Sequence, residues 1–400
     1  MRLLRGSARH IVGVTALLCA WLAPPATIAT FAAGTTAWAE TAPVSLKVRI
    51  AIYRRKLAEY TKAHDAYEKL AGPYWQAVTE KRSRRRAKMA RGEALDLDDY
   101  VAEQPPVYSG PPKPKDPQEE KRPKPREIPD VTDFLAHARA QFGFTPQTPA
   151  TELDYKRAYA KVASAADLGK DVCVKIYGFE SGGDGKYDIQ AGREYNRKAK
   201  VISTALGYNQ LLTTNTVELL AEAGSQFLAV LSTMAKGADV VRKAHLQDKI
   251  TKLKKMIAFS RTVPDDWNEH GKLAGTPRGL GIHALNLDVD VGPLLQTQKL
   301  LTSVIFARKK GYTAPLTAAD LEMMNLTGDG NGYDMVSMSP ELREKVPTSN
   351  FFQRGGYERN PVASRNNTVA KLLAATDAKM VKESALQGAK DLAAAFDGVQ

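Results

Sequence analysis

A glutamate placed where an apolar helix stops is the first feature of this sequence that could do chemistry. Residues 168–180 carry apolar side chains at steps of four, down to Glu180, and Gly182-Gly183 follow. Paired glycines end helices, so the pattern predicts a helix that stops just after Glu180. A carboxyl group at the end of a buried helix is desolvated and has a raised pKa, as a general acid needs. The alternative is a surface glutamate at a helix C-terminus, where the helix dipole disfavours it.

Two further segments place amide and aromatic side chains beside glycines. The first is Gly207-Tyr208-Asn209-Gln210-Leu211. The second is predicted as a short helix over 318–325, which runs into a glycine-rich turn at 328–333. That turn carries oxygen-bearing side chains but lacks the closing glutamate of an EF-hand loop, so we expect a turn and not a calcium site.

In this order the segments resemble the lysozyme-like soluble lytic transglycosylases, which cleave the glycan strands of peptidoglycan. That family has a helix ending in Glu-Ser, then Gly-x-x-Gln-Leu, then Ala-x-x-Tyr-Asn-x-Gly. Glu180-Ser181 matches the first, 207–211 the second and Asn325 the third, with Met324 where the family has tyrosine. The resemblance covers roughly residues 155–360.

The resemblance implies a lysozyme-like α-helical catalytic domain that works with one carboxylate and no cofactor. Glu180 would protonate the glycosidic oxygen between N-acetylmuramic acid and N-acetylglucosamine. It would then take the proton of the muramic acid C6 hydroxyl, which leaves a 1,6-anhydro end, the product of a lyase. Further side chains that would bind the glycan are Ser181, Tyr208, Gln210, Asn325 and Tyr333. Core packing is the alternative role for each tyrosine.

Two other functions stay open at this point. A muramidase-like or chitinase-like hydrolase normally needs a second carboxylate, and Asp184 or Asp188, just after Glu180, could supply it. A non-catalytic protein that binds the cell envelope would use the basic residues and an inactive cleft.

Composition and the first residues predict an exported protein. The chain has 400 residues and a formal charge of +13. Residues 1–39 begin with arginines, continue through an apolar run at 11–23 and end in Ala37-Trp38-Ala39, the pattern of a cleaved signal peptide. The mature protein is then periplasmic or secreted, has no membrane span, and meets anionic envelope polymers before it meets nucleic acid.

The cysteines and histidines predict no metal site. Six histidines are scattered singly, and Cys173 would be the one cysteine left after signal cleavage. Because Cys173 lies in the apolar run 172–176, we expect a buried structural cysteine.

The mature chain divides into three predicted parts. Residues 40–92 form an amphipathic helical segment whose helix spans 46–91, with tyrosines every seven residues at 53, 60, 67 and 74, and Gly72-Pro73 should kink or split this helix. Such a stripe is typical of a packing seam, and the basic run 81–91 suits an acidic polymer. Residues 93–130 form a proline-rich linker, and residues 131–390 form the mainly helical catalytic domain.

Overall fold

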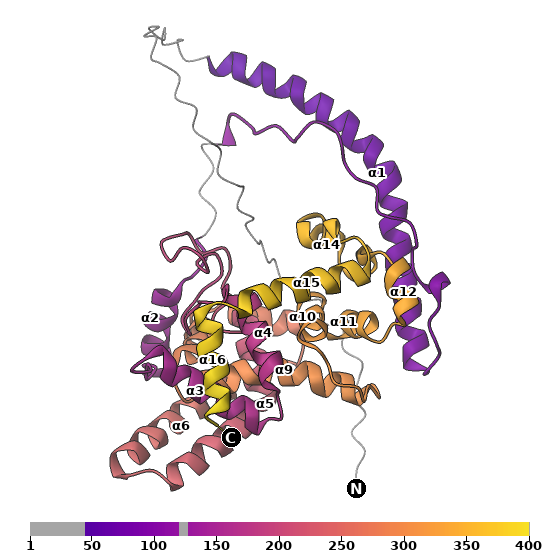
Figure 1. Ribbon diagram of the computed structural model, residues 1–400. Helices are drawn as coiled ribbons and strands as arrows, with labels where there is room; N and C mark the ends of the chain where they lie inside the picture. Colours follow the sequence, from indigo (N-terminus) through magenta and orange to yellow (C-terminus); the bar gives the residue numbers. More distant parts are fainter. Residues whose placement is uncertain (1–44, 120–126, 400) are drawn as a thin grey trace, which may run out of the picture. The chain divides into compact units, whose positions relative to one another are not determined.

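The computed structural model describes residues 45–119 and 127–399 (Figure 1). These residues are mainly helical, as the sequence predicts, and the pairing between extended segments within them is confined to isolated β-bridges. They fall into two compact units, one on each side of the gap. The signal peptide predicted for residues 1–39 lies outside the described residues.

The unit over residues 45–119 is built on one long helix. Helix α1 (Leu46–Ala90) covers nearly all of the predicted range, and Pro73 lies inside it without ending it. A 3₁₀ turn, η1 (Leu97–Asp99), reverses the chain, which then runs back beside α1 in an extended form (Figure 1). Lys88 pairs with Asp99 at 2.7 Å, and the guanidinium of Arg85 lies over the ring of Tyr100, which anchors the reversal.

The proline-rich segment covers part of the tyrosine stripe. The ring of Tyr108 packs edge-on against Tyr60 and Tyr67, with centroids 6.0 and 5.5 Å apart, and tilted against His64 at 5.9 Å. Prolines hold this segment extended without donating backbone hydrogen bonds. The stripe is therefore a packing seam whose partner is this extended segment.

The unit over residues 127–399 contains the other helices. Their bounds are α2 (Val131–Phe142), α3 (Glu152–Ala165), α4 (Lys170–Ser181), α5 (Thr213–Lys236), α6 (Val240–Ser260), α7 (Trp267–Ala274), α8 (Pro277–His283), η3 (Ala284–Leu287), α9 (Gly292–Lys309), α10 (Ala318–Thr327), α11 (Asp329–Val336), α12 (Pro340–Lys345), η4 (Thr348–Phe351), α13 (Arg354–Glu358), α14 (Pro361–Arg365), α15 (Val369–Ser384) and α16 (Gln387–Asp397).

Two hydrophobic cores lie along this unit and share one helix. The first is formed mainly by α2, α5, α6 and α8, and the second by α3, α4, α10 and α16. Helix α9 contributes Leu294 and Leu295 to the first core and Leu300 and Ala307 to the second. It therefore joins the two halves of the unit.

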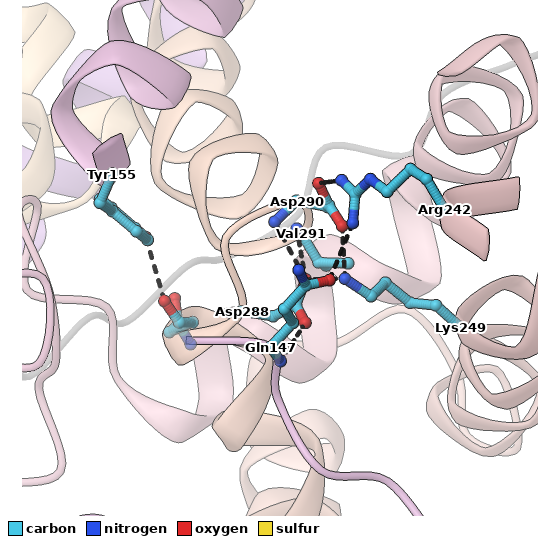
Figure 2. Close-up of polar contacts among 8 residues, drawn as sticks. Gln147, Tyr155, Arg242, Lys249, Asp288, Asp290 and Val291 are labelled. Atoms are coloured by element: carbon cyan, nitrogen blue, oxygen red, sulfur yellow. Dashed lines mark hydrogen bonds and ion pairs between the residues drawn. The ribbon is translucent and has the colours of Figure 1, made fainter. Parts of the chain in front are cut away.

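A buried ionic network fixes the start of α9. Lys249 of α6 contacts Asp288 at 2.7 Å and also Asp290, which accepts from Arg242 as well (Figure 2). The other carboxylate oxygen of Asp288 accepts from the backbone of Gln147 at 2.8 Å. Buried carboxylates cost free energy unless they are paired in this way, so α6, the 143–150 loop and α9 are held together.

Candidate active site

Glu180 lies at the last turn of α4, where the sequence predicts the helix to stop. The helix ends at Ser181, and Gly182 follows in the left-handed region with φ of +69°. Gly183 also has positive φ, and a Cβ there would lie 2.5 Å from the carbonyl oxygen of Glu383. Two glycines are therefore required for the sharp exit that leaves Glu180 beside α10 and α15.

The carboxyl group of Glu180 is buried and held by Asn325. Its side chain is 2% exposed, and its Oε1 accepts from Asn325 Nδ2 at 2.9 Å. Asn325 lies on α10, whose first turn is fixed by reciprocal bonds between Thr317 and Asp320. Two of the three sequence segments thus meet at one carboxyl group.

A second carboxyl group, which the sequence analysis did not single out, completes this site. Glu322 lies three residues before Asn325 on α10, is 1% exposed and acts electrostatically on Glu180. Residues three apart share a face of a helix, so Asn325 and Glu322 approach Glu180 together. That spacing was the one available signal, because Glu322 stands in the segment that contains Asn325.

Burial is the main cause of the electrostatic character of the site. It raises the pKa of Glu180 to about 7, against the lowering effects of Lys379, of the contact with Glu322 and of Lys299, while Glu194 adds to the rise. The pKa of Glu322 is raised well above its ordinary value by burial and by the charge of Glu180. Near neutral pH, Glu180 can both release and accept a proton.

Lys379 connects the site to α15. Its Nζ lies 4.2 Å from the centroid of the Phe179 ring and 3.5 Å from the Phe179 carbonyl oxygen. This places a positive charge next to the end of α4, where it favours the ionised form of Glu180.

The predicted glycan-binding residues of the first two segments turn inward. Ser181 is buried and donates to the carbonyl oxygen of Tyr177 at 2.6 Å. Gln210 donates to the carbonyl oxygens of Ile189 and Gly207 at 3.1 and 2.9 Å, and so fixes the loop between α4 and α5.

Tyr208 lies in the hydrophobic core, so it has the packing role that the sequence analysis gave as the alternative to glycan binding. Its ring packs edge-on against Tyr155, Tyr159 and Tyr177, and its hydroxyl donates to Glu152 at 2.5 Å. The side chain is fully buried, so neither face of the ring is free to stack on a sugar.

The remaining predicted residues have partners of their own. Tyr333 is partly exposed and donates to the carbonyl oxygen of Lys310 at 3.2 Å. Asp188 pairs with Arg197 at 3.0 Å, and Asp184 accepts from the backbone of Gly388 at 2.7 Å.

The prediction of a glycine-rich turn at residues 328–333 is wrong in part. Gly328 has φ of +82°, but residues from Asp329 onward form helix α11. A Cβ at Gly332 would lie 2.3 Å from Cα of Met324, so this glycine lets α11 pack closely on α10. The turn pattern was misread because glycine also permits close helix contact.

A small pocket borders the site on the side of Asn325. It has a volume of about 80 Å³ and is lined in part by Trp267, Lys299, Met324, Asn325 and Asp329.

Cys173 is buried, as its apolar surroundings predict. Burial raises the pKa of its thiol to about 12, so the thiol stays protonated and unreactive. Within residues 45–119 and 127–399, no group of three or more His, Cys, Asp or Glu side chains is placed to hold a metal ion. In the same ranges no helix combines the length and apolar character needed to cross a bilayer.

Comparisons with known proteins give this site no relatives. No protein-family model, no curated protein and no solved structure matches the chain.

Proposed function

We propose that this protein is an exported lytic transglycosylase that cleaves peptidoglycan, with Glu180 as its catalytic residue. The observation that carries the proposal is the buried Glu180 carboxyl, held by Asn325 and with a pKa raised to about 7. A carboxyl group with that pKa is present in both protonation states at neutral pH, as one residue needs when it serves as acid and then as base.

The proposed reaction uses Glu180 twice. The neutral carboxyl donates its proton to the glycosidic oxygen, and the bond between that oxygen and C1 of N-acetylmuramic acid breaks, assisted by the 2-acetamido group. The Glu180 carboxylate then takes the proton of the C6 hydroxyl, and the C6 oxygen forms the new bond to C1. Water is not consumed, the product is a 1,6-anhydro ring, and Glu180 regains its proton.

The wider assignment rests on the resemblance and on the order of elements. A lysozyme-like catalytic domain over residues 131–390 would place the acid at the end of α4, the Gly-x-x-Gln segment before α5, and Asn325 on α10. Residues 1–39 would be removed on export to the periplasm or the exterior, residues 40–92 would help to place the enzyme on glycan strands, and residues 93–130 would follow as the proline-rich segment.

The partners of Asp184 and Asp188 favour this reaction over hydrolysis. Asp188 is paired with Arg197, and Asp184 accepts from the backbone of Gly388. Neither carboxylate is kept unpaired for the activation of water, which is the task of the second carboxylate in an inverting hydrolase.

The test is digestion of purified peptidoglycan with residues 40–400, followed by mass spectrometry of the released fragments. We expect anhydromuropeptides, and we expect Glu180→Gln to reduce their release by at least about 10²–10⁴-fold, the usual contribution of general acid–base catalysis. Asp188→Asn is the matched control and should keep most of the activity. Circular dichroism checks that both variants fold.

Two results would contradict the proposal. Release of anhydro ends by a folded Glu180→Gln protein at the wild-type rate would remove Glu180 as the catalyst. Fragments with reducing ends, together with equal losses in Asp188→Asn and Glu180→Gln, would assign a hydrolase with two carboxylates instead.

A further inference from the structure

Two buried carboxyl groups from different helices face each other at the candidate site. Glu180 comes from the end of α4 and Glu322 from the middle of α10, and they are 2% and 1% exposed. Natural proteins rarely bury a glutamate without a partner, because desolvation of the charged form is costly. Two buried glutamates at one site need an explanation beyond packing.

The hydrogen-bonding groups of the pair are incomplete if both carboxyls are ionised. Glu180 Oε1 accepts from Asn325, but Glu180 Oε2 and both oxygens of Glu322 are buried and have no hydrogen-bond partner among the described residues while both groups are ionised. An ionised carboxylate is an acceptor only, so two of them cannot satisfy each other. One proton on Glu322 supplies the missing donor, and Glu180 Oε2 is the acceptor.

Two lysines and one further glutamate act electrostatically on the pair. Lys379 of α15 and Lys299 of α9 act on both glutamates, and Glu194, in the loop after α4, adds a negative charge near Glu180. Like charges at close range in a buried site raise the cost of the second ionisation, so one proton is retained.

We infer that Glu322 is a positioning residue that keeps a proton and donates it as a hydrogen bond to Glu180. Both donors to Glu180 then come from one face of α10: the Asn325 amide to Oε1 and the Glu322 hydroxyl to Oε2. Together they fix the orientation of the carboxyl and support its ionised form between the acid step and the base step. This inference rests on the proposed function only in giving Glu180 those two steps.

Infrared spectroscopy of the mature chain tests the retained proton without relying on activity. A buried neutral carboxyl absorbs above the amide I band, and at pH 8 Glu180 is mostly ionised whereas Glu322 is not. We expect the wild-type protein to show such a band at pH 8. Glu322→Gln should lose it, Glu180→Gln should keep it, and Glu344→Gln, at an exposed glutamate, should leave the spectrum unchanged.

The pH profile of peptidoglycan cleavage tests the positioning role. The amide of Glu322→Gln can still donate to Glu180, so we expect the pKa of the alkaline limb, where neutral Glu180 is lost, to stay within about half a unit of wild type and kcat within about tenfold. Glu322→Met removes the donor and should move that pKa upward by about one unit or more. A purely structural role for Glu322 would lower the yield of folded protein but would not move the pKa.

The outcomes separate this inference from the proposed function. A wild-type protein without the band at pH 8, or a band that survives in Glu322→Gln, overturns the shared proton. If the band behaves as expected but the wild-type protein does not cleave peptidoglycan, the proton pair stands and the proposed function fails. Equal pH profiles for wild type and Glu322→Met overturn the positioning role.

Discussion

Replacing Glu180 with glutamine should make the protein more stable at neutral pH, because a buried carboxyl group that is costly to ionise is removed. The pKa of Glu180 is about 7 in the folded protein, against an ordinary value of 4.5. Between these values the folded state binds more protons than the unfolded state, so the free energy of unfolding falls as the pH rises. Each pKa unit corresponds to about 1.4 kcal/mol, so Glu180 accounts for a loss of about 3 kcal/mol between pH 4.5 and pH 8.

Glutamine removes this loss and keeps the local contacts. Its side-chain oxygen can still accept from Asn325 Nδ2, and its amide can donate to Glu322. The two proteins should therefore have similar stability at pH 4.5, and the glutamine variant should be more stable by about 3 kcal/mol at pH 8.

Urea unfolding followed by circular dichroism, at half-unit steps from pH 4.5 to pH 8, measures this difference. Asp188→Asn is the control, since its carboxylate is partly exposed and paired with Arg197 outside the buried pair. Parallel stability curves for wild type and Glu180→Gln would refute the raised pKa. A variant that is less stable than wild type at pH 8 would show that the ionised carboxylate is favourably held.

Two further predictions concern the surroundings of the site and the first unit. Lys379→Met keeps the contact with the Phe179 ring but removes a positive charge that favours ionised Glu180, so the pKa of the alkaline limb of activity should rise by about one unit; an unchanged profile would show that Lys379 does not act on the site. Tyr108→Ala removes the ring that covers Tyr60, so limited proteolysis should cut residues 101–119 faster than in the wild-type protein, and equal rates would contradict the packing seam.

Local signals in the sequence were sufficient to place Glu180. The helix stop at Gly182-Gly183 depends on backbone conformation within a few residues, and it appears as predicted. Asn325 was predicted only as a glycan-binding residue, through the resemblance, and its hydrogen bond to Glu180 was not predicted, since the two residues are far apart in the chain.

Contacts made by tertiary packing could not be predicted in the same way. Glu322 pairs with a group of its own sign, which no charge pattern indicates, and its role follows only from the contact between α4 and α10. Tyr208 and Gln210 belong to a loop whose inward or outward direction depends on the whole fold. Their sequence spacing is the same in either case.

The position of Glu322 also bears on the type of reaction. In two-carboxylate glycosidases the sugar lies between the carboxyl groups, which are about 5–5.5 Å apart in retaining enzymes and about 6.5–9.5 Å apart in inverting ones. Glu180 and Glu322 are 2% and 1% exposed, so no sugar lies between their carboxyl groups. A hydrolase that activates water with a second carboxylate would therefore have to free Asp188 from Arg197, or Asp184 from Gly388, whereas the proposed anhydro-ring formation needs only Glu180 and the glycan's own C6 hydroxyl.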